Sequence, residues 1–269
     1  MKYAVLSDIH ANSDAFAAVL EKCAALGVDH YLFLGDLVGY NADPQRCLDM
    51  ARELNFLASV RGNHDEYTIS GNTELAGFNK NATIAIQWTR QQLNDEDLDF
   101  LDAMPLRASI PGTPITLVHA TLDSPDTWGY VFDSHHAVGN FSYQRTQICF
   151  CGHSHVPVAF DKAPLMTGRK LVDRIEEWEH NFYYPEADED FSLADELPVQ
   201  LEKGHKYLFN IGSIGQPRNN DPRSSFAVFD DQTMTVSRYR VPYNIAAAQE
   251  KVRAAGLPER LAWRLEAGQ

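Results

Sequence analysis

The stretch Lys2–His10 reads KYAVLSDIH, an apolar run that ends in an acidic residue and a histidine. The run from Lys2 to Leu6 has the length and composition of one buried β-strand. A helical pattern follows over Ser13–Leu26, in which the apolar residues form one stripe: Phe16, Val19, Leu20 and Cys23. Gly27 then ends the predicted helix, as glycine commonly does. The chain therefore begins with a strand and a helix, and two polar residues lie between them.

The same strand–helix unit is repeated in the next thirty-odd residues. Tyr31–Leu34 predicts a second strand and Phe56–Val60 a third. Between them, Asp43 and Pro44 predict the N-cap and first turn of a helix. Its inward face consists of Cys47, Leu48, Ala51 and Leu54. A β-α-β-α-β order predicts three parallel strands with right-handed crossovers.

The remainder of the chain changes from helical to β-rich. Helical segments are expected over about 82–103, ending at Pro105, and a last helix over Ile245–Ala255. The predicted strands between them are Leu106–Ile110, Ile115–Val118, Ile148–Cys151, Val156–Phe160, Tyr207–Ile211, Phe226–Phe229 and Thr235–Val241. The acidic stretch Glu186–Glu196 is expected to be a solvated loop. We interpret the 269 residues as a single α/β domain with a substrate-facing insertion expected at about 161–205, whose aromatic residues are expected to pack locally.

Composition excludes several classes of function. Apolar residues make up 44% and charged residues 22%, which is typical of a globular protein. No run of eighteen apolar residues occurs, so we expect neither a membrane span nor a membrane partner. A net charge of −14 argues against a nucleic-acid polymer as partner, because such binding needs a positive surface. It leaves a small phosphorylated substrate open, since bound cations reverse the local field.

The four cysteines indicate a reducing compartment. Cys23 and Cys47 fall on the apolar faces of predicted helices, and Cys149 and Cys151 on one predicted strand. None forms a Cys-x-x-Cys pair, so we interpret them as buried small hydrophobic residues rather than disulfides or zinc ligands. No targeting signal is recognised, and a cytoplasmic location is expected.

Residues of the metal-ligand type follow five predicted strands. Five of the ten histidines are among them, and the full set is Asp8, His10, Asp36, Asn63, His64, His119, His153 and His155. In α/β sheets, ligands bind at the carboxyl ends of the strands. Taken singly, each acidic residue could be a helix cap, and His119 a histidine at the edge of the core. Together, and in this order, they predict a metal site.

The pattern resembles the calcineurin-like metallophosphoesterase superfamily, in its bacterial small-phosphoesterase type. The resemblance extends over about residues 1–160 and continues in Asn210-Ile211-Gly212-Ser213. It rests on Asp8-x-His10, Gly35-Asp36, Gly62-Asn63-His64-Asp65, His119 and Gly152-His153-Ser154-His155. It implies a four-layer α/β/β/α sandwich of two mixed sheets flanked by helices.

The resemblance also implies two divalent metal ions. Asp8, His10, Asp36 and His155 would hold one ion; Asp36, Asn63, His119 and His153 would hold the other. Carboxylate, imidazole and amide ligands suit Mn, Fe, Zn, Co or Ni, and the sequence does not choose among them. Two ions roughly 3.5–4 Å apart can share a water as nucleophile and stabilise the phosphoryl oxygens.

Three further residues receive roles. His64 follows a ligand without being one, and we predict that it is the general acid that protonates the leaving group. Asp65 is expected either to orient His64 or to cap the next helix. Arg218, in the loop Gly212–Arg218, is expected either to bind phosphate or to be a surface arginine.

The expected function is hydrolysis of a small phosphodiester or phosphomonoester, with nucleotide-derived compounds favoured. A protein phosphatase or a dinucleoside polyphosphate hydrolase is an alternative. Both of those families have an arginine shortly after Gly-Asp, and Gly35-Asp36-Leu37-Val38-Gly39 has none. A nuclease, a single-ion sensor and a non-enzymatic scaffold on the same fold also stay open. A scaffold would typically have lost ligands, and no ligand is lost here.

Overall fold

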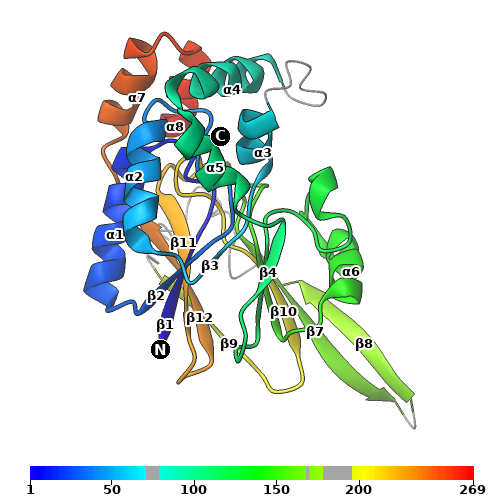
Figure 1. Ribbon diagram of the computed structural model, residues 1–269. Coiled ribbons are helices and arrows are strands. Elements are labelled where there is room, and N and C mark those ends of the chain that lie inside the picture. Colours follow the sequence, from blue (N-terminus) through cyan, green and yellow to red (C-terminus); the bar gives the residue numbers. More distant parts are fainter. Residues whose placement is uncertain (71–78, 168–169, 178–195) are drawn as a thin grey trace.

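Two mixed sheets of six strands each form the centre of the structure, a computed structural model that describes residues 1–70, 79–167, 170–177 and 196–269 (Figure 1). The first sheet has the order β3-β2-β1-β11-β12-β9. Its strands are β1 (Lys2–Leu6), β2 (His30–Phe33), β3 (Ala58–Ser59), β9 (Glu196–Gln200), β11 (Ser224–Asp230) and β12 (Thr235–Val241). The strands β1, β2 and β3 are parallel, as predicted, and the other neighbours in this sheet are antiparallel.

The second sheet has the order β4-β5-β6-β10-β7-β8. Its strands are β4 (Arg107–Ser109), β5 (Ile115–Val118), β6 (Ile148–Cys151), β7 (Val158–Thr167), β8 (Lys170–Glu177) and β10 (Lys206–Asn210). Here β5, β6 and β10 are parallel. Each sheet thus contributes three parallel strands, and the loops that follow their carboxyl ends carry the predicted site.

Helices cover the outer faces of both sheets and one end of the sandwich. On the first sheet lie α1 (Ser13–Leu26), α2 (Pro44–Leu54) and α5 (Asp95–Asp102), and on the second lies α6 (Ser134–Tyr143). The other helices are α3 (Asn63–Ser70), α4 (Lys80–Gln92), α7 (Ile245–Ala254), α8 (Glu259–Ala267) and a 3-10 turn, Pro125–Thr127. Figure 1 shows α3, α4 and α8 gathered at one end of the two sheets.

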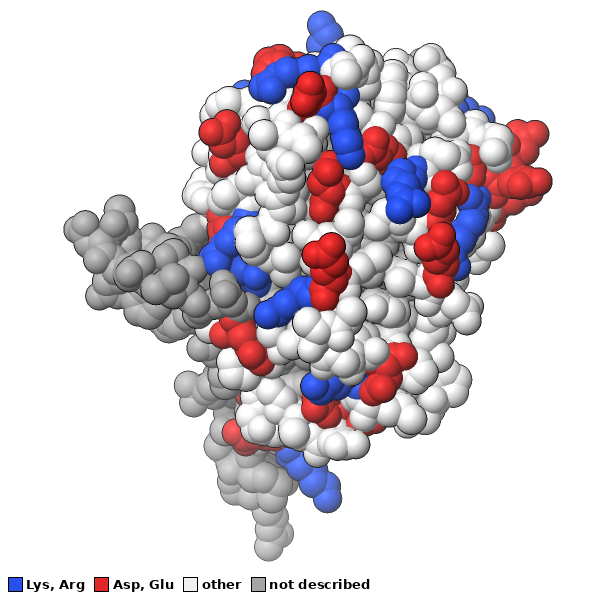
Figure 2. Space-filling model, turned by 90° about the vertical axis from the view of Figure 1, so that its left-hand side faces the viewer, with Lys and Arg blue, Asp and Glu red and all other residues white. Residues whose placement is uncertain are grey.

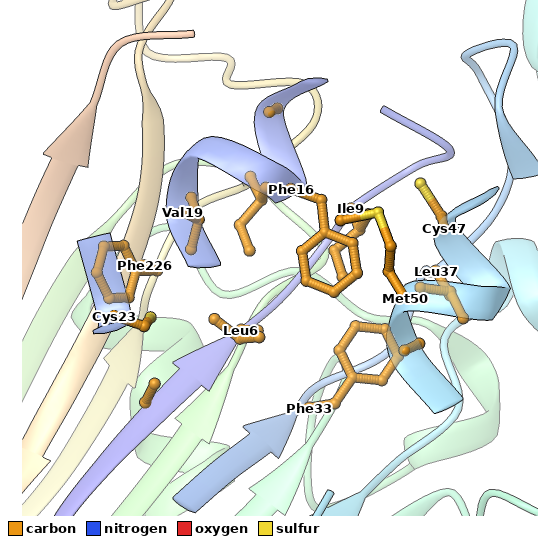
Figure 3. Packing of buried hydrophobic residues seen from close by; sticks show 14 of the residues in the cluster. Leu6, Ile9, Phe16, Val19, Cys23, Phe33, Leu37, Cys47, Met50 and Phe226 are labelled. Atoms are coloured by element: carbon orange, nitrogen blue, oxygen red, sulfur yellow. The ribbon is translucent and has the colours of Figure 1, made fainter. Parts of the chain in front are cut away.

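Alternating side chains of the strands build the successive core layers. Leu6 points outward to Phe16 and Val19 of α1 (Figure 3), whereas its neighbour Val5 points inward to the second sheet. Phe141 of α6 packs in a third cluster on the far side of that sheet. Three stacked cores require four layers of secondary structure, so the predicted α/β/β/α sandwich is confirmed.

The strand and helix predictions are correct to the residue for β1, α1, β5, β6 and β12. The predicted helical region 82–103 is two helices, because Asn94 and Asp97 form a capping box that starts α5. Asp43 stands at the N-cap position of α2 and Pro44 in its first turn, as predicted, but the Asp43 side chain makes no capping bond. It accepts instead from Ser13 and from the Lys251 ammonium, which is 2.6 Å away.

All four cysteines are free and buried, as predicted. Other predictions concern segments that the structure describes only in part. Within the segment 161–205, β8 and most of β7 pair as antiparallel strands and extend away from the end where α8 packs (Figure 1). The aromatic residues Trp178, Phe182, Tyr183 and Tyr184, and most of Glu186–Glu196, lie outside the described residues. No helix of the described chain is long and apolar enough to span a bilayer.

Candidate metal centre

The eight predicted ligand and acid residues converge at one end of the sandwich. Asp8 and His10 follow β1, Asp36 follows β2, and Asn63 and His64 open α3 after β3. From the second sheet, His119 follows β5, and His153 and His155 follow β6. All eight side chains are buried, which is unusual for such polar residues and requires specific partners.

Several residues of these loops have a backbone conformation that residues other than glycine normally avoid. Five of the site residues have a positive φ: Asp8, His10, Asp36, His153 and His155. A left-handed conformation is costly for a residue with a Cβ, and such residues tend to be found at functional sites. The loops after β1, β2 and β6 are therefore shaped to aim these side chains at a common point.

Backbone carbonyl groups determine which nitrogen of each histidine is available. The Nδ1 atoms of His10, His155 and His119 lie 3.1, 2.6 and 2.8 Å from the carbonyl oxygens of Val38, Gln216 and Leu34. A carbonyl only accepts, so in the neutral form of each ring Nδ1 carries the proton and Nε2 carries a lone pair. Contacts of this kind orient metal-binding histidines in proteins.

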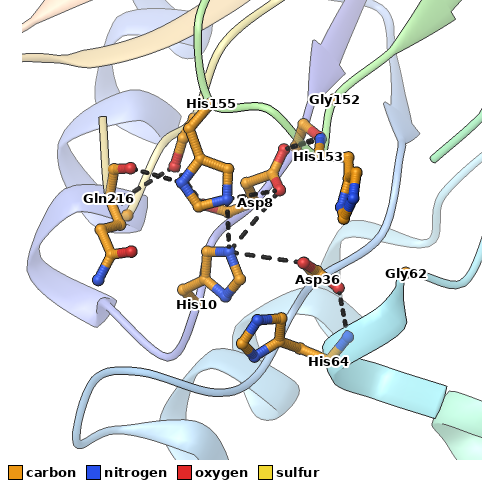
Figure 4. Close-up of polar contacts among 12 residues, drawn as sticks. Asp8, His10, Asp36, Gly62, His64, Gly152, His153, His155 and Gln216 are labelled. Atoms are coloured by element: carbon orange, nitrogen blue, oxygen red, sulfur yellow. Dashed lines mark hydrogen bonds and ion pairs between the residues drawn. The ribbon is translucent and has the colours of Figure 1, made fainter. Parts of the chain in front are cut away.

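Two of these lone pairs face each other. The Nε2 atoms of His10 and His155 are 3.0 Å apart (Figure 4). With both Nδ1 atoms donating to carbonyls, neither Nε2 has a proton to place between them. Two facing lone pairs repel, and a cation between them removes the repulsion. The arrangement therefore fits a bound metal ion.

Two carboxylate oxygens complete the same group. Oδ1 of Asp8 lies 3.1 Å from Nε2 of His155, and Oδ2 of Asp36 lies 3.5 Å from Nε2 of His10. Both oxygens are buried and accept no hydrogen bond from the described residues. Ligands about 2.1 Å from one ion stand roughly 3–3.5 Å from each other, and these spacings agree. Asp8, His10, Asp36 and His155 can thus hold one metal ion.

A second group shares Asp36 with the first. Its Oδ2 atom lies 3.4 Å from Nε2 of His119, which is also 3.2 Å from Oδ1 of Asn63. His153 differs from the other histidines, since its Nε2 lies 2.9 Å from the Trp128 carbonyl oxygen and its Nδ1 carries the lone pair. Asp36, His119 and His153 form a second ligand cluster, with Asn63 beside it.

The protonation states also suit metal binding. Burial lowers the pKa of His155 to about 3 and that of His153 to about 4, so both are neutral. Against burial, His155 and His10 hold the pKa of the Asp8 carboxyl well below its usual value, so it is ionised. His119 departs from this pattern: against the effect of burial, Asp36 raises its pKa to about 9. Metal binding there would release its proton.

His64 lies beside the ligand groups without belonging to either. Its backbone N–H donates to Oδ1 of Asp36 at 2.8 Å, and its ring packs against Tyr40, with 4.3 Å between ring centroids. Burial keeps the pKa of His64 well below its usual value. Both His64 and Tyr40 line a pocket of about 130 Å³ beside the metal ligands.

Of the two roles expected for Asp65, the described contacts include none with the His64 ring and favour a role at the start of α3. Its two carboxylate oxygens accept the backbone N–H groups of Asp36 and Leu37 at 2.8 and 2.9 Å, and that of Gly62 at 3.1 Å. Three backbone N–H groups thus satisfy the two carboxylate oxygens. Asp65 therefore positions the loop that carries Asp36.

Arg218, for which a phosphate-binding and a surface role were both expected, lines the pocket. Its Nη2 donates to Tyr40 Oη and to Gln216 Oε1, both at 3.1 Å, and its Nε is buried without an acceptor in the described chain. Sequence reasoning missed Tyr40, Tyr130 and Arg264, which line the same pocket. Tyr40 has a positive φ of 63°, but no local pattern in the sequence signals this. Arg264 belongs to a helix that was not predicted.

Gly62 allows the loop after β3 to approach Asp36, which leads to a prediction. A Cβ at this position would lie 2.1 Å from Oδ1 and 2.6 Å from the backbone nitrogen of Asp36. We expect Gly62→Ala to lower the unfolding free energy by roughly 1–3 kcal/mol and to reduce metal occupancy. The measurements are thermal unfolding and elemental analysis.

Gly139 in α6 provides the matched control. A Cβ there meets nothing within 4 Å. Gly139→Ala is expected to leave metal content unchanged and to stabilise the helix by about 0.5–1 kcal/mol. Full metal occupancy in Gly62→Ala would show that the close approach does not shape the site.

Comparisons with known proteins agree with this geometry. The sequence model of the calcineurin-like phosphoesterase superfamily domain matches residues 1–172. An uncharacterised protein of Methanocaldococcus jannaschii is 36% identical over 267 residues, which are 98% of this chain and 97% of that protein. The crystal structure of a metallophosphoesterase from Sphaerobacter thermophilus has a TM-score of 0.79 at 36% identity, covering 100% of this chain and 99% of that one. A hypothetical protein from Pyrococcus horikoshii OT3 has the same fold, with a TM-score of 0.71 at 18% identity and coverages of 100% and 98%.

Proposed function

Because the chain belongs to the calcineurin-like phosphoesterase superfamily, we propose that it hydrolyses a small phosphodiester or phosphomonoester with two divalent metal ions bound. The observation that carries this proposal is the pair of facing Nε2 atoms of His10 and His155, 3.0 Å apart, with unbonded carboxylate oxygens beside them. Without a cation, the facing lone pairs and the carboxylate oxygens repel one another. The group is therefore better explained by metal binding than by a structural role.

The proposed ligand sets share one carboxylate. One ion would be held by Asp8, His10, Asp36 and His155, and the other by Asp36, Asn63, His119 and His153. When bound, two such ions lower the pKa of a shared water and offset the charge of phosphoryl oxygens. The buried carbonyls behind the histidines hold these ligands in place before substrate arrives.

Two further side chains act on the substrate in this proposal. The Arg218 guanidinium has a buried Nε without an acceptor in the described chain, and it lines the pocket, so it can bind the phosphoryl oxygens. His64, beside Asp36, donates a proton to the leaving oxygen. Since the ring of His64 packs on Tyr40 and His10, its position toward the phosphate is constrained.

A row of aromatic rings supports a nucleotide-derived substrate. Tyr130 stacks on His153 with 4.3 Å between centroids, and Phe132 stacks on Tyr130 at 5.1 Å. Tyr130 is 43% exposed and Phe132 is 50% exposed, so the row leads from the pocket to the surface. Base stacking on exposed aromatic rings contributes about 1–3 kcal/mol per base.

The surface charges support a small substrate rather than a polymer. The chain has a net charge of −14, and among the described residues on the face in Figure 2 the basic and acidic side chains are interspersed, with no basic track. We propose no nucleic-acid or membrane partner. Retention of every ligand position also disfavours a non-enzymatic scaffold.

Reconstitution of activity tests the proposed function. Chelator-stripped protein is titrated with Mn²⁺ and assayed with bis-p-nitrophenyl phosphate and p-nitrophenyl phosphate. We expect activity that appears with the metal and disappears on renewed chelation. The ratio of the two rates then distinguishes a diesterase from a monoesterase. Folded, metal-loaded protein that cleaves neither ester with any of Mn, Fe, Zn, Co or Ni would contradict a general phosphoesterase.

A further inference from the structure

A second, cationic hollow adjoins the metal pocket. Its volume is about 460 Å³, and it shares Asn79 and Arg264 with the metal pocket. Its other lining residues are Lys80, Asn81, Arg260 and Gln269. Three of these six side chains are cationic and none is a carboxylate, in a chain with an excess of acidic residues.

Arg264 joins the two spaces and lies beside Arg218. Both guanidinium groups lie over the Tyr40 ring, 5.9 and 5.5 Å from its centroid. Nε of Arg264 donates to the main-chain oxygen of Gln269 at 2.5 Å. Within the described chain, no side-chain carboxylate pairs with either arginine, whereas Arg52 and Arg223 have Asp97 and Asp221.

Placing these two cations together is unfavourable without an anion. Burial, and after it the positive charge of Arg218, lower the pKa of Arg264 to about 10. Arg264 therefore stays charged at neutral pH and repels the neighbouring Arg218 guanidinium. An anion bound between or beside them relieves this repulsion, and phosphate matches the planar donor pattern of a guanidinium.

The fold holds Arg264 rigidly in this place. Leu261 and Ala262 of α8 are buried against Tyr40 and against Ala82 and Ala85 of α4. After the helix, the Gly268 carbonyl accepts from the backbone N–H of Asn220 at 2.8 Å. The end of α8 is thus tied to the loop that carries Arg218, so little conformational freedom is lost when an anion binds.

The hollow lies apart from the two metal-ligand groups. The hollow contains no side chain of either metal-ligand group, and Arg218 does not line it. We propose that the substrate carries a second phosphate in addition to the one that is cleaved, and that Arg264 binds it with Lys80 and Arg260 alongside. This inference rests on the proposed function and names its substrate class as esters with at least two phosphates.

Binding of matched nucleotides tests this inference without hydrolysis being required. Mn²⁺-loaded protein of measured metal content is titrated calorimetrically with AMP, ADP and adenosine 3′,5′-bisphosphate. We expect one of the two-phosphate compounds to bind roughly 10-fold or more tightly than AMP, since a charge-assisted contact is gained. In Arg264→Gln this ratio should fall to near one. Arg46→Gln, which removes an exposed charge in α2, should keep the ratio.

Other outcomes of this titration would overturn the second phosphate site or assign Arg264 a different role. Equal affinities of the three nucleotides for the unchanged protein, or binding of none, would overturn the second phosphate site. Equal losses for AMP and for the two-phosphate compounds in Arg264→Gln would place Arg264 at the scissile phosphate instead. Arg260→Gln, an exposed position, should reduce the ratio in part and serves if Arg264→Gln fails to fold. If the unchanged protein preferred the two-phosphate compounds over AMP but hydrolysed no phosphate ester, the proposed function would be refuted. The second phosphate site would then still stand.

Discussion

Replacing Asp36 by asparagine is expected to abolish metal-dependent hydrolysis, with kcat falling by more than about 10³-fold. Asp36 is the residue that both ligand groups share, and its Oδ2 faces His10 at 3.5 Å and His119 at 3.4 Å. An amide lacks the charge that holds two divalent ions close together, so both ions should bind more weakly. The assays are the rate with bis-p-nitrophenyl phosphate and the metal content after dialysis.

The metal-free fold should survive this substitution. The amide oxygen of the new asparagine can still accept the His64 N–H, as Oδ1 of Asp36 does, and one buried negative charge is removed. We therefore expect the chelator-treated variant to melt within a few degrees of the unchanged protein. The rise in melting temperature that Mn²⁺ produces should be lost, because that rise reports binding to the folded state.

Asp97→Asn is the matched control for a buried aspartate. Asp97 is 1% exposed, belongs to the capping box of α5 and accepts from Arg52 at 2.7 Å, away from the metal ligands. This variant should be less stable yet retain its response to Mn²⁺. If Asp36→Asn kept both its metal ions and its activity, the shared-carboxylate arrangement would be refuted.

Replacing His64 by glutamine is expected to affect substrates according to their leaving group. With an alkyl phosphate ester, the rate should fall by about 10²–10⁴-fold, because an alkoxide needs a proton as it leaves. With p-nitrophenyl esters the loss should be much smaller, since p-nitrophenolate leaves without one. The ratio of the two effects, measured at constant metal content, separates proton donation from damage to the site.

The pH dependence of the hydrolysis rate should also report proton donation by His64. Burial lowers the pKa of His64 in the free protein, and the negative charge of a bound phosphate raises it again. His64 donates only when protonated, so the rate with an alkyl ester should decline as pH rises through this pKa in the complex. The decline should be absent in His64→Gln.

His30→Gln serves as the histidine control, because His30 lies in β2 outside both ligand groups. It should change neither rate. Equal losses for alkyl and p-nitrophenyl esters in His64→Gln would show that His64 positions the metal ligands or the substrate and does not donate the proton.

Local sequence determines the strands and helices of this protein and which residues form its metal site. Each ligand follows a recognisable apolar run, as Asp8 follows Lys2–Leu6 and His119 follows Ile115–Val118. Parallel strands end at one edge of their sheets, so residues after these strands meet without further information. For this reason the fold class and the convergence of the eight residues could be predicted.

Contacts between distant segments could not be predicted in this way. His10 meets His155 across 145 residues, and Arg218 meets Tyr40 across 178. Asp65 was expected either to orient His64 or to cap the next helix, and its carboxylate also accepts the N–H groups of the loop around Asp36. A carboxylate can satisfy many donors, and only the packed structure shows which ones come closest.

The tertiary structure alone decided the chemistry around the ligands. Whether Nδ1 or Nε2 of a histidine faces a metal depends on which carbonyl lies behind the ring, as Trp128 does for His153 and Leu34 for His119. Arg264 enters the pocket because α8 packs on Tyr40, an arrangement set by apolar burial rather than by any motif. Periodicity reports the backbone path and the buried faces, whereas tautomers and charge pairing depend on distances between elements that folding alone brings together.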